Sequence, residues 1–157
     1  MKLVKQTKKR FQYQVSREDA GALRFLAKQF PITAFSAATI SKTDAGSKAV
    51  EREKLLNESL RAHREDLKRK ARDLVLPEKF KSADGEQFYH ISLEGRESML
   101  QILNDIRVES WRILGEPEDP ETNIFRLAKD KFKYYHFMRL AGYFEYHFLN
   151  LQEEEKR

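Results

Sequence analysis

The chain has 157 residues, of which 40% are hydrophobic and 35% charged, and it contains no cysteine. This length and apolar content are typical of one globular domain and exclude an intrinsically disordered chain, while the lack of cysteine excludes disulfides, thiolate zinc sites and cysteine nucleophiles. The net charge of +5 arises in residues 1–10, which hold five lysines or arginines and no acid, so the rest of the chain is neutral.

The first predicted elements are a basic arm over residues 1–10, a short strand and a helix. Hydrophobic residues alternate with glutamines over residues 11–15, which is the period of a half-buried strand. Ser16, followed three residues later by Asp19, predicts the N-cap of a helix. Pro31 is expected to end that helix, since proline cannot continue it.

A long amphipathic helix is predicted over residues 48–76, after an ordered linker over residues 30–47. The helical segment contains no proline or glycine, and Pro77 ends it. A repeat of three or four positions places its apolar residues in one stripe along the helix. The stripe consists of Leu56, Leu60, His63, Leu67, Ala71 and Leu74.

A second unit of strand and helix begins with a turn over residues 81–86 and a strand over residues 87–91. Ser92 caps the following helix, which runs to Leu114, where Gly115 supplies a left-handed stop. Apolar positions cover most of the circumference of this helix, so we interpret it as a central helix that neighbouring elements must enclose. The two strands are expected to pair as a small antiparallel ribbon against the helices.

A final helical region is predicted from about residue 123 to residue 153, after an acidic loop that contains two prolines. Eight aromatic residues lie within residues 132–148 and decorate more than one helix face. We interpret them as a broad core face plus an association surface, with base stacking as the alternative. The predicted fold class is mainly α: a single helical domain over residues 11–153, built as a bundle around the central helix, with a small two-stranded antiparallel ribbon.

The candidate site on the central helix is a polar patch made of Asn104, Asp105, Arg107 and Trp111. Arg107 falls on the same stripe as several leucines, where an unpaired charge is costly, so a carboxylate or an anion must accompany it. One interpretation is a structural arginine paired with an acid from another element, and the other is a recognition patch. If the charge partner is buried, Arg107→Ala is expected to destabilise the fold by about 3 kcal/mol or more.

The sequence contains no recognised motif for catalysis or for cofactor binding. The four histidines lack metal-ligand spacing, the six glycines form no phosphate-binding loop, and no serine belongs to a triad pattern. We therefore expect no enzyme activity, no metal and no cofactor. An enzyme with an unfamiliar site is the alternative.

A basic surface is predicted from two clusters of lysine and arginine. If these side chains bind phosphates, the protein binds nucleic acid with a strong dependence on salt. The members are Lys2, Lys5, Lys8, Lys9 and Arg10 in the arm and, from the Arg126–Arg139 cluster in the final helical region, Arg126, Lys129 and Lys133.

Several short motifs resemble a known family. Residues 103–107 (Leu-Asn-Asp-Ile-Arg), followed by Leu-Gly at 114–115 and an acidic loop, are similar to an uncharacterised bacterial family called domain of unknown function two-thousand-seventeen. Three other motifs stand in the order in which that family has them: Phe-Pro at 30–31, Glu-Arg-Glu at 51–53 and Leu-Ala-Gly-Tyr-Phe at 140–144. Genes of the family often lie beside the gene of the ClpS protease adaptor. The resemblance implies a bacterial cytoplasmic protein linked to regulated proteolysis, without an established activity.

The predicted function is binding, by a helical protein-interaction or adaptor-like protein. A protein partner or a second copy of the chain is expected in preference to nucleic acid, and no small molecule is identified. No apolar run approaches the roughly 18 residues that span a bilayer, and residues 1–10 lack the features of a secretion signal. We therefore expect no membrane partner and a cytoplasmic location.

Overall fold

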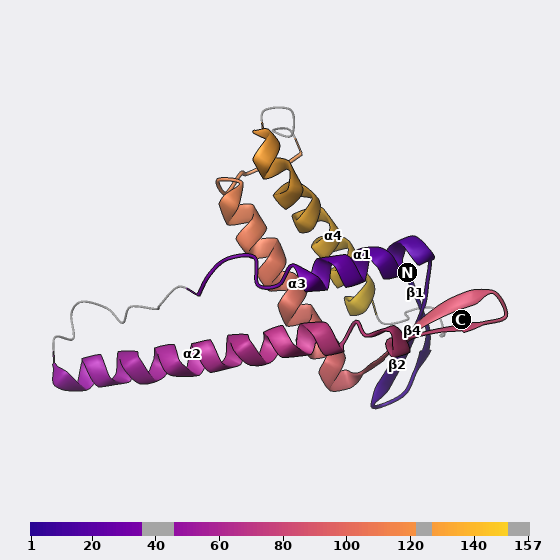
Figure 1. Cartoon of the computed structure of the whole chain (residues 1–157), viewed down its shortest axis with the longest axis horizontal. Coiled ribbons are helices and arrows are strands. Elements are labelled where there is room, and N and C mark those ends of the chain that lie inside the picture. The colour runs from indigo at the N-terminus through magenta and orange to yellow at the C-terminus, as the bar shows by residue number, and fades with distance from the viewer. Residues whose placement is uncertain (36–45, 122–126, 151–157) are drawn as a thin grey trace.

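The computed structural model describes residues 1–35, 46–121 and 127–150 and shows a mainly α-helical protein with a small antiparallel sheet (Figure 1). Two short 3-10 turns, η1 (Pro77–Lys79) and η3 (Lys129–Lys131), precede β3 and α4. In the described ranges the other elements are β1 (Lys2–Gln6), β2 (Arg10–Val15), α1 (Arg17–Lys28), α2 (Ser47–Asp73), β3 (Phe80–Ala83), β4 (Glu86–Ser92), α3 (Leu93–Ile113) and α4 (Phe132–Leu149).

The sheet has the strand order β1-β2-β4-β3, and every neighbouring pair is antiparallel. The two strands predicted from the sequence, β2 and β4, pair at the centre, from Arg10 opposite Ser92 to Val15 opposite Gln87. Their antiparallel pairing is confirmed. The expectation of only two strands is wrong, because β1 and β3 extend the sheet to four.

Both edge strands lie where the sequence pattern predicts other structure. β1 occupies most of the segment expected to be a basic arm, and Leu3 is its one buried residue. β3 begins where a turn was expected, and the turn itself centres on Asp84 and Gly85, whose φ angles of 51° and 80° are typical of a tight hairpin. An edge strand leaves one side to water and tolerates polar residues, so it needs no clear alternation of hydrophobic residues.

The inner face of the sheet packs on the helices through aromatic side chains. Tyr13 and Tyr89 are fully buried, and the ring of Phe148 in α4 meets them at centroid distances of 5.2 and 6.3 Å. The Tyr89 hydroxyl donates a hydrogen bond to the carbonyl oxygen of Leu74 at 2.9 Å. These contacts join the sheet to the ends of α4 and α2. The amino end of α4 lies at the other end of that helix, away from the sheet (Figure 1).

The helix predicted to be central, α3, packs against α4 and α2 (Figure 1). Met99, Ile102, Leu103 and Ile106 are completely buried, so neighbouring elements enclose these turns as expected. Closer to the carboxyl end of α3, the side chain of Trp111 is 36% exposed. The enclosure therefore covers the middle of α3 and is only partial at its last turn, where Ser110 is buried and Trp111 is not.

The predicted helix boundaries follow from local hydrogen bonds. The hydroxyl oxygen of Ser16 accepts a hydrogen bond from the amide of Asp19, and that of Ser92 accepts one from the amide of Gly95, each at 3.0 Å. Each cap satisfies one of the free amides in the first turn of its helix. Gly115 follows α3 with a φ of 88°, the left-handed stop that the sequence predicts.

The helix α2 stands away from the rest of the molecule over most of its length (Figure 1). Only Leu67 and Ala71 among its residues are buried. Leu56 and Leu60 belong to the same predicted stripe, yet each is 40% exposed. The stripe is therefore packed at its carboxyl end and open toward its amino end.

One buried arginine in α3 has no counterpart in the sequence-based predictions. The guanidinium of Arg96 donates two hydrogen bonds to the carbonyl oxygen of Phe148, one of them from Nε at 2.8 Å, and stacks 4.6 Å above the ring of Phe11. It thereby satisfies a free carbonyl at the end of α4 and ties that end to the sheet. No sequence signal reveals this role, because the acceptor is a main-chain atom about fifty positions away.

Candidate functional site in the cleft between α2 and α3

A cleft opens where α2 diverges from α3, and the segment after α1 forms its third wall. Its volume is about 500 Å³. Phe30, Phe35, Leu60 and Leu67 supply apolar surface, so the open half of the leucine stripe leads directly into it. The polar lining comes from His63 and Arg64 on α2, Asp105, Glu109 and Arg112 on α3, and Thr33.

The α3 wall carries three charged residues that share one helix face because they are spaced by three or four positions. Glu109 accepts a hydrogen bond from Nη1 of Arg112 at 3.0 Å and another from the Thr33 hydroxyl at 3.3 Å. Asp105 differs, since its Oδ2 is buried and has no hydrogen-bond partner among the described residues. Burial raises the pKa of Asp105, and the nearby positive charge of Arg64 opposes that rise.

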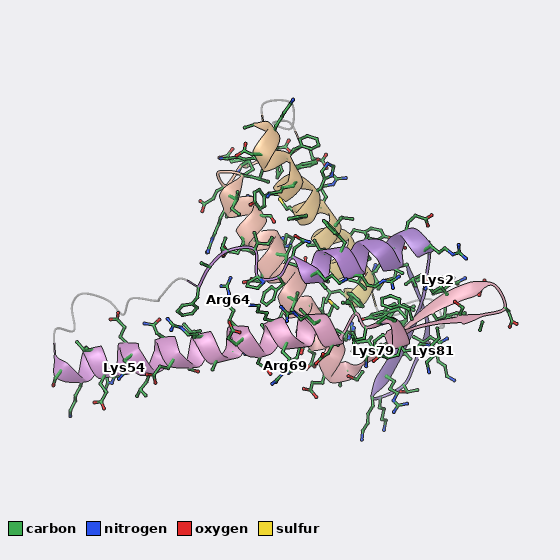
Figure 2. All side chains as sticks on the ribbon, in the orientation of Figure 1. Lys2, Lys54, Arg64, Arg69, Lys79 and Lys81 are labelled. Carbon is green, nitrogen blue, oxygen red and sulfur yellow. The ribbon has the colours of Figure 1, made fainter. Side chains whose placement is uncertain are left out.

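Arg64 reaches from α2 toward the wall formed by the segment after α1 (Figure 2). Its Nη2 donates a hydrogen bond to the carbonyl oxygen of Thr33 at 2.6 Å. Its Nε is buried and, within the described ranges, has no acceptor. The cleft therefore holds an oxygen that lacks a donor and an N–H that lacks an acceptor, both between apolar walls. A ligand with one donor and one acceptor would satisfy both groups.

Only one member of the predicted polar patch lines this cleft. Asp105 does, whereas Asn104, Arg107 and Trp111 lie on another face of α3, because each step along a helix rotates the side chain by about 100°. The indole N–H of Trp111 donates to the carbonyl oxygen of Pro117 at 3.1 Å. The four residues therefore do not form a single site.

Arg107 has the acidic partner that the structural interpretation expects. Its Nε lies 2.8 Å from the carboxylate of Glu145 in α4, and its Nη2 donates to the side-chain oxygen of Asn104 at 3.0 Å. The Arg107 side chain is 45% exposed, whereas the side chain of Glu145 is 14% exposed, so the arginine reaches from a solvent-accessible position to a mostly buried partner. This pair lies between an exposed pair, which contributes about 0–1 kcal/mol, and the fully buried partner for which a loss of about 3 kcal/mol or more is expected.

The structure divides the predicted basic surface into separate parts. Lys2, Lys5 and Arg10 lie on β1 and β2, and Lys8 and Lys9 lie in the turn between these strands. The other cluster contains Arg126, which lies outside the described residues, and Lys129 and Lys133, which lie at the amino end of α4. That end is roughly 20 Å along the helix from the end that meets the sheet, given a rise of about 1.5 Å per residue.

Comparison of the chain with protein-family profiles, curated proteins and solved structures found no match in any of the three. In the described ranges, no three His, Asp or Glu side chains are grouped so that they could hold a metal ion. No helix in those ranges has the length and apolar character needed to cross a membrane. The site itself therefore supplies the functional evidence.

Proposed function

We propose that the protein is a protein-binding module that takes up a segment of a partner protein along α2 and in the cleft between α2 and α3. The open half of the leucine stripe carries this proposal. Leu67 is 8% exposed, whereas Leu56 and Leu60 on the same face are each 40% exposed. An amphipathic partner segment would cover this face in the way that α3 covers the packed half.

The polar groups of the cleft support a partner that presents its main chain. A peptide unit carries one N–H donor and one C=O acceptor. These are the two groups that Oδ2 of Asp105 and Nε of Arg64 lack in the described structure. The proposed partner segment therefore places apolar side chains on Leu56 and Leu60 and an accessible peptide group in the cleft. The family resemblance makes components of Clp-type proteolysis the first partners to test.

Photocrosslinking tests this proposal directly. A photoreactive amino acid at position 56 is expected to capture the partner in cells. The same group at position 55 is expected to capture little, because Leu55 lies about 100° around the helix from Leu56. Leu55 is a matched control, since it is also an exposed leucine of α2.

Binding of the captured partner, once purified, is then measured by titration calorimetry. The double variant Leu56→Gln/Leu60→Gln is expected to weaken binding by about tenfold or more, since covering the exposed part of two leucines contributes roughly 1.4 kcal/mol or more. Leu55→Gln is expected to change the affinity by less than about twofold, and all variants should melt at the wild-type temperature. Equal crosslinking from positions 55 and 56, or unchanged affinity in the double variant, contradicts the proposal.

A further inference from the structure

The outer face of the sheet combines positive charge with an aromatic side chain. Residues opposite each other in neighbouring strands point to the same face. One cross-strand row therefore contains Lys2 of β1, Gln14 of β2, Phe88 of β4 and Lys81 of β3. The next row contains Lys5, Gln12 and His90.

This face is open to solvent at its edges and positively charged. Lys2, Lys5 and Lys81 are exposed, and the described structure shows no ion pair for any of them (Figure 2). Arg10, which faces Ser92 at one end of β2, is also exposed. Glu86 is the one acid in the strands that form the face. An anion near this face therefore meets several cations and little repulsion.

Phe88 lies half-buried on the central strand β4, between the edge lysines. Lysines on edge strands also discourage edge-to-edge pairing of sheets, and this role alone would account for Lys2 and Lys81. It does not account for an aromatic ring on the outer side of a central strand, flanked by glutamine amides and an imidazole. A ring in this position offers a flat apolar surface beside hydrogen-bonding groups.

The sheet is also hollowed at the end of the row that contains Phe88. A cavity of about 580 Å³ opens there, and its lining includes Lys2, Gln14 and Arg17 together with the acids Asp19 and Glu86. A ligand on this face thus finds cations and a stacking surface.

We infer that the outer face of the sheet binds single-stranded nucleic acid, with a base stacked on Phe88 and phosphates held by Lys2, Lys5 and Lys81. Aromatic stacking with flanking cations is how proteins hold unpaired strands without strict sequence preference. A duplex keeps its bases stacked on one another and cannot cover Phe88. An anionic membrane would use the charges and leave the hydrogen-bonding groups without a role. This inference is independent of the protein-binding function proposed for α2.

Fluorescence anisotropy of the full chain with a labelled 20-nucleotide oligo(dT) tests the inference. We expect a log-log salt slope near −2, since about three phosphate contacts to a single strand give roughly −0.7 each. Phe88→Ala should weaken binding about tenfold, in the range that stacking of one base contributes, and Phe88→Tyr should restore it. Melting curves of both variants verify folding, and the recovery with tyrosine keeps the test valid if alanine weakens the sheet.

The charge contribution is tested with two triple variants of identical net charge. Lys2→Gln/Lys5→Gln/Lys81→Gln should lower the affinity at least tenfold, whereas Lys48→Gln/Arg52→Gln/Lys54→Gln on α2 should change it less than threefold, because only the first set faces the strand. Three outcomes overturn the inference. They are an equal loss of affinity in both triple variants, tighter binding of a 20-base-pair duplex than of oligo(dT), and binding to phosphatidylserine vesicles without binding to oligo(dT). Absence of oligo(dT) binding at 50 mM salt overturns it as well.

Discussion

At the scale of single residues, the pKa values of two aspartates shift in opposite directions. One aspartate lies in the α2–α3 cleft and the other lies on the surface of α2. Burial raises the pKa of Asp105, because the ionised carboxylate loses contact with water. The pKa of Asp66, a partly exposed residue of α2, is lowered, chiefly by a hydrogen bond from Lys70. The surroundings of the aspartate therefore disfavour its ionised form in the cleft and favour it on the surface of α2.

These two aspartates predict opposite effects of pH on stability. A carboxyl group whose pKa is raised by folding stabilises the fold at pH values below its ordinary pKa of 3.8. This stabilisation is lost as the pH rises through the pKa of the folded state. Asp105→Asn should therefore raise the melting temperature relative to wild type as the pH increases from about 4 to 7. A gain of roughly 2–4 °C at neutral pH corresponds to about 1 kcal/mol in a chain of this size.

Asp66→Asn serves as the control with the opposite sign. Its lowered pKa stabilises the fold above its ordinary value of 3.8, and this contribution is lost as the pH falls. The variant should therefore melt slightly below wild type at neutral pH and match it in acid. Circular-dichroism melting curves from about pH 2.5 to pH 8 measure both variants, because the stabilisation by Asp66 is lost only below its ordinary pKa. A difference between Asp105→Asn and wild type that does not change with pH would contradict the role assigned to burial.

At the scale of whole elements, the predictions succeed where a signal is local in the sequence. Ser16 and Ser92 cap their helices and Gly115 ends α3, because a cap depends on hydrogen bonds within a few residues. The central strands have the alternating pattern of half-buried strands and are found. β1 and β3 lack it, because only their pairing with a neighbouring strand holds them in the sheet.

Packing around two helical glycines predicts opposite effects of the same substitution. A Cβ at Gly95 in α3 would lie 2.8 Å from a side-chain carbon of Leu74 and 3.0 Å from one of Ile91. A Cβ at Gly21 in α1 would meet no atom within 4 Å. Gly95→Ala should therefore lower the free energy of unfolding by about 1–3 kcal/mol, as overpacking does, despite the better helix propensity of alanine.

Gly21→Ala is the matched control. It should raise the free energy of unfolding by up to about 1 kcal/mol, because alanine gains helix propensity without a clash. Urea unfolding of both variants, followed by circular dichroism, gives the two values. Stabilisation by Gly95→Ala would show that α3 lies farther from the end of α2 than the structure places it.

At the scale of the whole molecule, the projecting α2 sets an elongated shape. None of residues 47–66 is buried, and residues 47–59 precede the cleft, so about thirteen residues extend from the body (Figure 1). At about 1.5 Å per residue, this part of the helix is roughly 20 Å long. A compact chain of the same length would have a radius of gyration near 15 Å.

Small-angle X-ray scattering of a dilute solution checks this shape. The radius of gyration of the monomer should clearly exceed about 15 Å, because α2 carries mass away from the centre. The forward scattering gives the molecular mass and separates an elongated monomer from a dimer. A monomer with a radius of about 15 Å would mean that α2 folds back onto the body and covers Leu56 and Leu60, and the proposed partner surface would then be absent.

The sequence by itself determined the helices, their caps, the two central strands and the stripe on α2, because these depend on spacing and hydrogen bonds within a few residues. Only the tertiary structure decided which half of that stripe is covered, that Asp105 faces α2 while Arg107 faces α4, and that the basic segment before Phe11 lies in a sheet. These features depend on contacts between residues far apart in the chain. Helical and strand periodicity define faces, but the packing of other elements decides which faces meet.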